Sequence, residues 1–335
     1  MNNPVRAYIL RRSAKQAVKN QNWAKAASLY EALRRTGAAR PSDVVRHAQA
    51  TEATGRKDAA EQIHRDNVGL FPLEPNVHRQ NALFLLRHQK EPEAALAFAR
   101  ARVLAPSDEV LKADLERLGV RDDRIYAVAV AALHAGLPPH PARPGIVAKF
   151  RARRAAKTAK ALRQSGDWKS ALVAQTTVLA HNPHNAFAQI RLGHVLKALN
   201  RPDEAETAYW KGVALAPKDA VGYLQLGHGL RSERGLQNAL PAYLMAQKLE
   251  PSLIEAGVAA NESDLPEHGR ARLADALASA NIKAILTFKS DEDASGSSTE
   301  SSRRMSAIQR PTPRSINVRA AAIAGDIAHA VGASL

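Results

Sequence analysis

The residues best able to do chemistry in this chain are twelve histidines and a large excess of lysine and arginine. His194 and His228 lie 34 residues apart, so a repeated unit of that length would bring them close together. Two histidines without a nearby carboxylate or thiolate make a weak zinc site, so we expect no metal or other cofactor. The chain has no cysteine, which excludes disulfides, iron–sulfur clusters and thiol catalysis.

Motifs of the common enzyme classes do not occur. The sequence contains no glycine-rich dinucleotide fingerprint after a strand, no phosphate-binding loop, no His-Glu-x-x-His and no Gly-x-Ser-x-Gly. Little of the chain alternates as a strand would, so a nucleotide-binding sheet has no place in it. We therefore expect no catalytic residues and no enzymatic activity.

Positive charge is the strongest compositional signal. The 335 residues include 48 Lys and Arg against 32 Asp and Glu, which gives a net charge of +16. The densest run, residues 149–163, has no acid, and five of its cations share about a third of a helix circumference at about 100° per residue. A surplus of this size favours an anionic partner: nucleic acid, anionic lipid or an acidic protein. The cations of the run are Lys149, Arg151, Arg153, Arg154, Lys157, Lys160 and Arg163.

A period of 34 residues organises most of the sequence. Pro183, Pro217 and Pro251 follow one another at this spacing, and an alanine lies twelve residues before each of them. Pro72 and Pro106 continue the period in the N-terminal part. Alanine-rich sequence favours helix, and a proline ends the helix that precedes it. Each unit is therefore expected to form two antiparallel helices. Six units fit, at 7–40, 41–74, 75–108, 152–185, 186–219 and 220–253.

This pattern resembles the tetratricopeptide repeat, most clearly in 186–219 and 220–253. The former carries Leu192, Gly193, Ala205, Tyr209 and Pro217 at the repeat's characteristic places. The resemblance implies an all-α solenoid of helix–turn–helix repeats in a right-handed superhelix. The run LGHVLKALNRPDEAETAYWKGVALAP is also similar to the repeats fused to bacterial glycosyltransferases and O-GlcNAc-transferase-like proteins, whose catalytic domain is missing from this sequence.

We expect two modules and a tail. The N-terminal module covers 1–142, with repeats 7–40, 41–74 and 75–108 and a degenerate cap at 109–142 that contains helices over 110–118 and 122–134. A proline- and glycine-rich linker at 136–145 leads to the C-terminal module, 143–289, with repeats 152–185, 186–219 and 220–253 and a capping helix over 267–288. Residues 290–335 are expected to form a disordered low-complexity tail with a short amphipathic helix over 316–331.

The resemblance further implies that positions 2, 5, 6, 9, 12 and 13 of each unit line the concave face. These 36 positions hold 14 Lys or Arg and one acid, whereas the rest of the chain is nearly balanced in charge. We therefore expect a basic groove for a partner. Its candidate residues are Arg12, Lys15, Arg46, Gln80, Arg87, Arg153, Lys157, Lys160, Arg163, Arg191, His194, Lys197, Gln225, His228 and Arg231.

The interpretation we favour is a non-catalytic scaffold or adaptor that binds an acidic or extended segment of a protein, with the amides of Gln80 and Gln225 holding its backbone. One alternative is RNA or DNA held by its phosphate backbone, although the groove offers only Tyr8 and Phe187 for base stacking. Another is a substrate-selecting part of a glycosyltransferase system. The N-terminus has no signal-peptide pattern and no run of about 20 apolar residues occurs, so the expected location is the cytoplasm.

Overall fold

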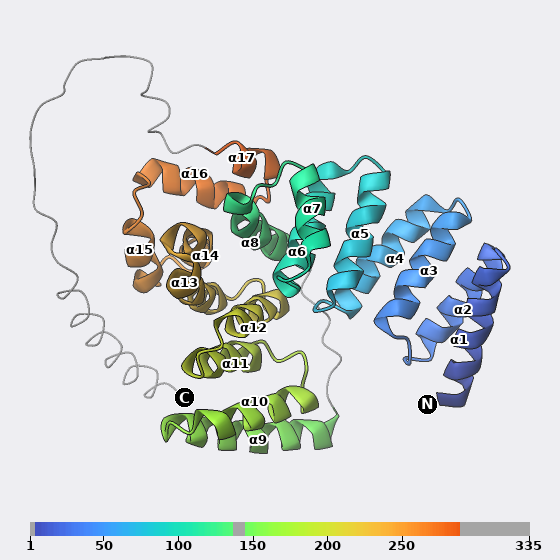
Figure 1. Ribbon diagram of the computed structural model, residues 1–335, viewed down its shortest axis with the longest axis horizontal. Helices are drawn as coiled ribbons and strands as arrows, with labels where there is room; N and C mark the ends of the chain where they lie inside the picture. The colour runs from blue at the N-terminus through green and yellow to red at the C-terminus, as the bar shows by residue number, and fades with distance from the viewer. Residues whose placement is uncertain (1–3, 137–144, 289–335) are drawn as a thin grey trace, which may run out of the picture. The chain divides into compact units, whose positions relative to one another are not determined.

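The computed structural model describes residues 4–136 and 145–288, which belong to one compact unit, and these ranges contain helices and no strand. The all-α fold expected from the period is confirmed (Figure 1). The predicted disorder of 290–302 and helix of 316–331 lie outside the described residues, as does most of the predicted linker.

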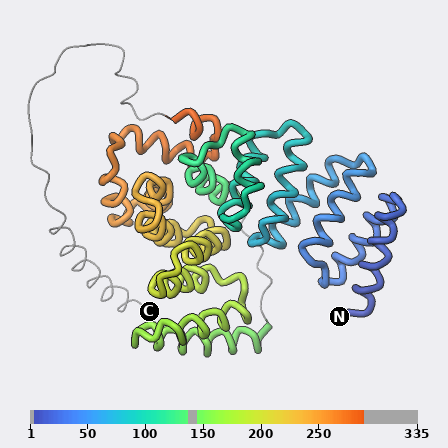
Figure 2. The backbone as a smooth tube through the Cα atoms, in the orientation of Figure 1, coloured from blue at the N-terminus to red at the C-terminus, as the bar shows by residue number. Residues whose placement is uncertain are grey.

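The N-terminal part forms four consecutive pairs of helices (Figure 2). The first three pairs are hairpins, each packed on the next, whereas both helices of the fourth pair, α7 and α8, pack on α6. The predicted helices within 109–142 are both present, the second preceded by a short 3-10 turn, Asp122–Arg124. The helices are α1 (Pro4–Lys19), α2 (Trp23–Arg35), α3 (Pro41–Ala53), α4 (Lys57–Leu70), α5 (Pro75–Arg87), α6 (Glu91–Leu104), α7 (Glu109–Arg117) and α8 (Ile125–Ala135).

The C-terminal part forms a second series of hairpins. Helix α9 has 19 residues, whereas α11 and α13 have 13 and 15, so it extends further at its N-terminus than the other first helices of this series. The helices are α9 (Ile146–Gln164), α10 (Trp168–His181), α11 (Ala186–Ala198), α12 (Pro202–Leu215), α13 (Ala220–Arg234), α14 (Leu236–Leu249), α15 (Ile254–Asn261), α16 (Glu267–Ala278) and α17 (Ile282–Leu286).

The single capping helix expected over 267–288 is wrong, because this segment forms α16 and α17 with a break between them. Ala280 adopts a positive φ of 50°, which ends the first helix. The side chain of Asn281 then accepts a hydrogen bond from the backbone N–H of Ala284 at 3.1 Å and so caps the second. The apolar periodicity runs through both helices, and it therefore concealed the break.

The turn inside each hairpin uses one residue with a left-handed backbone. Gln21, Gly55 and Gln89 have positive φ and are spaced by 34 residues, as are Gly166 and Asn200. Only two of these five are glycine, although glycine adopts this conformation most easily. The conformation is therefore a property of the repeat in five of the six units; in the sixth the positive φ falls one position later, at Gly235.

Close packing of the helices in the C-terminal series, both within a hairpin and between hairpins, depends on glycine and tyrosine. A Cβ added to Gly193 would lie 2.6 Å from the ring of Tyr209, and one added to Gly227 would lie 2.6 Å from that of Tyr243. The opposite edge of the Tyr209 ring meets the next hairpin, where a Cβ at Gly229 would lie 2.7 Å away. Each ring thus fills the space that the missing side chains leave.

The two series of hairpins share one apolar core. Helix α8 is buried over most of its length and packs on α6, α14 and α16, while α6 also contacts α12. The ring of Tyr126 stacks on that of Trp210 with centroids 6.1 Å apart. Arg124 donates a hydrogen bond to the carbonyl of Phe288 at 2.7 Å. Since α8 is occupied by α14 and α16, α9 packs mainly on its own partner α10.

Candidate binding groove

The predicted groove residues of the C-terminal series lie on three first helices, α9, α11 and α13. Arg153, Lys157 and Lys160 on α9 are exposed. Within the described residues, no acidic side chain forms an ion pair with any of these three. The helix itself contains no Asp or Glu. This surface therefore carries a concentrated positive charge that the fold leaves available.

Two histidines are held in the same way in consecutive repeats. The Nδ1 atom of His194 lies 3.1 Å from the hydroxyl of Tyr209, and Nδ1 of His228 lies 3.1 Å from that of Tyr243. In both pairs the rings meet edge to face, at centroid distances of 5.4 and 5.5 Å. A tyrosine hydroxyl that donates to Nδ1 leaves the proton on Nε2. The histidines then present an N–H donor on the side away from the tyrosines.

Electrostatic repulsion acts across α9, α11 and α13. Burial, and after it the nearby charges of Arg163, Lys197, His228 and Arg191, lower the pKa of His194 to about 4. His194 is thus neutral at neutral pH. The pKa of Arg163 is likewise lowered, by burial and then by Arg191. An anion placed among these groups would relieve the repulsion.

The Nε atom of Arg163 adds a second reason to expect an anion. It is buried and has no hydrogen-bond partner among the described residues. A buried donor without a partner costs about 1–3 kcal/mol. A carboxylate or phosphate oxygen within reach would satisfy it.

Acidic residues at the C-terminal end of the series close the other end of this groove. Arg231 donates to Glu262 at 2.5 Å, and Nε2 of His228 lies 3.1 Å from Glu255. Neither glutamate could be placed by the repeat, because the 34-residue pattern stops at residue 253. Arg231 and His228 are therefore partly neutralised, and the available positive charge lies on α9 and α11. The side chain of Gln225, on α13, is half-buried.

The N-terminal series carries a weaker version of this surface. Arg12, Lys15 and Arg46 are exposed. Gln49 donates from Nε2 to Oε1 of Gln80 at 3.0 Å, and Gln80 donates in turn to Asn76 at 3.4 Å. These amides form a row across α3 and α5.

Ion pairs reduce the positive charge of that surface. Arg87 pairs with Glu52 at 2.7 Å. Arg11 and Arg79, two of the 14 cations counted for the groove, pair with Asp43 at 2.8 Å and with Asp114 at 3.4 Å. Each pair joins the first helices of consecutive hairpins. These arginines therefore stabilise the stacking of the hairpins.

The expectation that position 5 lines the groove is wrong for three units. Val45, Ile190 and Leu224 occupy this position and are all buried, with exposed fractions of 6, 9 and 3%. Their side chains pack into the core; Ile190, for example, meets Gly212 of α12. Ala156 holds the same position in α9 and is only partly buried.

The part of the chain that the structure describes offers neither a metal site nor a membrane span. No group of three or more histidine, aspartate or glutamate side chains there is arranged to hold a metal ion. None of the helices in 4–136 and 145–288 combines the length and apolar character needed to cross a membrane.

Residues 162–225 match the sequence model of the tetratricopeptide repeat family. The match runs from the end of α9 into the first turns of α13, and so includes Arg163, Arg191, His194 and Lys197. No curated protein matches the chain.

Several solved structures are similar to this chain. The TPR2AB-domain:pHSP90-complex of yeast Sti1 shares 14% identity, over 83% of this chain and all of that one, with a TM-score of 0.32. YrrB, described as a TPR protein with an unusual peptide-binding site, shares 13% over 65% of this chain and 91% of its own, with a TM-score of 0.28. TTC0263, a thermophilic TPR protein of Thermus thermophilus, shares 19% sequence identity over 66% of this chain and 97% of its own, also with a TM-score of 0.28.

Proposed function

We propose that this protein is a non-catalytic binding scaffold whose groove on α9, α11 and α13 holds an acidic, extended segment of a partner protein. The observation that carries this proposal is the crowding of Arg163, Arg191 and Lys197 around the neutral His194. Like charges held close together in a half-buried groove repel one another, and carboxylates between them turn that repulsion into attraction.

The repeat supplies donors at regular intervals. His194 and His228 stand at equivalent places in consecutive units, and Arg163, Arg191 and Lys197 lie among them. An extended chain places its side chains at regular intervals too, so a segment with several Asp or Glu would meet successive units. Arginine binds carboxylates through two parallel hydrogen bonds, which favours a fixed register.

Nucleic acid is the competing ligand for the same cations. Proteins that bind single strands without sequence preference usually stack bases on aromatic rings. The exposed aromatics at predicted groove positions are Tyr8 on α1 and Phe187 on α11, one in each series of hairpins. Two isolated rings make a poor stacking surface, and we therefore favour a protein segment.

Charge reversal on α9 tests the proposal. The variant Arg153→Glu/Lys157→Glu/Lys160→Glu should weaken binding of a fluorescent oligoglutamate peptide by about a hundredfold, because three attractive contacts become repulsive. The matched control reverses three exposed lysines on second helices, Lys25, Lys57 and Lys169. It changes the net charge by the same amount and should bind almost as the unchanged protein does.

Two outcomes would contradict this proposal. Equal losses in both triple variants would show that net charge, and not the groove, attracts the peptide. Tighter binding of an oligothymidylate than of the peptide, with a steep dependence on salt, would identify a nucleic-acid channel.

A transferase that copurifies with the chain and loses substrates in the α9 variant would instead identify the groove as the substrate-selecting part of a glycosyltransferase system.

A further inference from the structure

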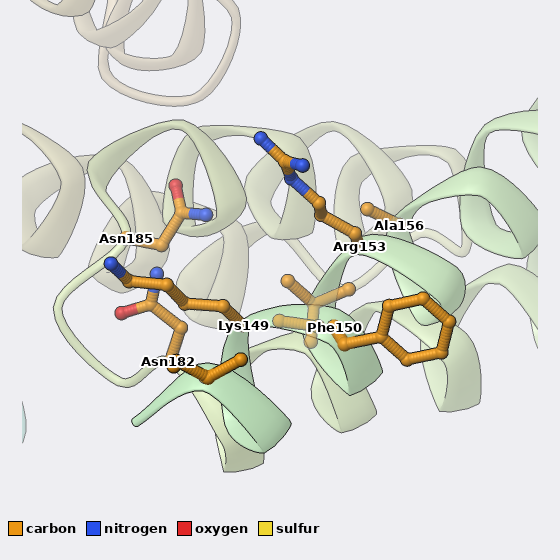
Figure 3. A pocket seen from close by; sticks show the side chains of 9 residues that line it. Lys149, Phe150, Arg153, Ala156, Asn182 and Asn185 are labelled. Carbon is orange, nitrogen blue, oxygen red and sulfur yellow. The ribbon is translucent and has the colours of Figure 1, made fainter. Parts of the chain in front are cut away.

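An opening beside the groove lies where the N-terminal end of α9 meets the end of α10. It is a cavity of about 480 Å³ lined by Ile146, Lys149, Phe150, Ala152, Arg153, Ala156, Val178, Asn182 and Asn185. Figure 3 shows the amides of Asn182 and Asn185 and the amine of Lys149 on one side, and the ring of Phe150 on the other. Apolar walls and polar groups thus meet in one site.

Ala156 and Val178 face each other across the wall of this cavity, on α9 and α10. Ala156 stands at position 5 of its unit, the position of Ile190 in α11 and Leu224 in α13. Ile190 reaches α12 so closely that a Cβ at Gly212 would lie 2.5 Å from its Cδ1. The side chain of alanine has three carbons fewer than that of isoleucine or leucine. The residue of α10 that corresponds to Gly212 is Val178, so this valine takes up part of the space that Ile190 fills in its own unit, and the cavity opens beside Ala156 and Val178.

Further exposed apolar surface borders this cavity. Ile146 and Phe150 belong to the N-terminal extension of α9 and are 86 and 70% exposed. Exposed apolar side chains next to an open cavity are typical of binding sites. The apolar part of the site therefore extends from the buried wall at Val178 to the surface at Phe150.

The rim of the cavity is basic and rich in hydrogen-bond donors. Lys149 and Arg153 are exposed and form no ion pair within the described residues. Asn185 accepts a hydrogen bond from the N–H of Ala188 at 3.0 Å through its oxygen, which leaves its NH₂ group as a donor. The rim thus favours carboxylates over cations.

We infer that this cavity binds one apolar side chain of the acidic partner segment, with flanking carboxylates at Lys149 and Arg153. The inference rests on the function proposed above and adds an anchor that fixes where the segment lies. A second copy of this chain is a poor occupant, because α9 carries seven cations and no acid and would repel another α9. A partner with acidic residues around a leucine or a similar side chain complements both the walls and the rim.

The test compares two peptides of Glu and Gly that differ only in a central leucine or alanine. Burying the extra carbons of leucine should make that peptide bind about tenfold more tightly to the unchanged protein. The variant Ala156→Leu fills the cavity with the residue that α13 has at this position, so it should bind both peptides equally. Ala161→Leu is the matched control, because it adds the same atoms at an exposed place on α9 and should keep the tenfold preference.

Phe150→Ser provides a second variant that does not depend on core packing, since Phe150 is exposed. It removes one wall and should also reduce the preference for leucine. Equal binding of the two peptides to the unchanged protein would overturn this inference but leave the basic groove standing. A preference for leucine that survives in folded Ala156→Leu would overturn it as well. Failure of both peptides to bind would refute the proposed function and the anchor together.

Discussion

Replacing Gly193 by alanine tests the packing of α11 on α12, the two helices of one hairpin of the groove. The new Cβ would lie 2.6 Å from Cε1 of the Tyr209 ring and 2.8 Å from Cδ1 and Cζ. The ring has no room to retreat, because on its other edge a Cβ at Gly229 would lie 2.7 Å from Cδ2. The substitution therefore forces Tyr209, or the helix that carries it, to move.

The expected magnitude follows from two opposing effects. Alanine is favoured over glycine inside a helix by about 1 kcal/mol. Overpacking a filled core costs about 1–3 kcal/mol. We expect Gly193→Ala to lower the free energy of unfolding by up to about 2 kcal/mol. Gly69 in α4 is the matched control, since no atom lies within 4 Å of the Cβ added there. Gly69→Ala should raise the free energy of unfolding by about 0.5–1 kcal/mol.

Urea denaturation followed by far-UV circular dichroism measures both effects. The double variant Gly193→Ala/Tyr209→Leu should lose less stability than the sum of its two single variants, because the smaller side chain makes room for the new methyl group. If Gly193→Ala is as stable as Gly69→Ala, the ring does not limit the approach of the helices. Our account of how the groove is assembled would then be refuted.

Two further predictions concern stability. Arg11→Ala should lower the free energy of unfolding by about 3–5 kcal/mol, because it leaves the buried carboxylate of Asp43 without its ion-pair partner. The control Arg12→Ala should change the free energy of unfolding by less than about 0.5 kcal/mol. Equal urea midpoints for the two variants would contradict this prediction. Burial lowers the pKa of His78 and of His194 to about 4, so between pH 6.5 and pH 4 the unfolded chain binds more protons than the folded one. Stability should therefore fall as the pH drops through this window, by up to about 1.4 kcal/mol per histidine per pH unit. Melting temperatures at pH 7 and pH 5 would measure the loss, and a His78→Gln variant that loses as much as the unchanged protein would argue against the assignment.

Local features of the fold were predictable from the sequence. The proline and alanine spacing located the hairpins of all six units, and it predicted the small residues that the tyrosines require. Helix formation and tight turns depend on neighbouring residues, so a period in the sequence becomes a period in the structure. The break at Ala280 was missed because the apolar pattern of α16 continues into α17.

The charge of the candidate groove was only partly predictable. Placing Arg11 and Arg79 at groove positions was reasonable from the repeat frame, yet both pair with an aspartate of the following hairpin. Glu255 and Glu262 lie beyond the last recognisable unit and neutralise part of the groove that the residue count left fully basic. A count by position records which charges are present, but only the folded chain decides which of them are paired.

The sequence by itself determined the repeated helical hairpin and the excess of cations on its first helices, since both follow from residue type and spacing. Tertiary structure alone decided that α8 packs on α14 and α16, because contacts between distant segments depend on the fit of two surfaces and leave no period in the sequence. It also decided that a cavity lies beside the short side chain of Ala156. A shorter side chain opens space only where the surrounding helices are already held in place by their own contacts.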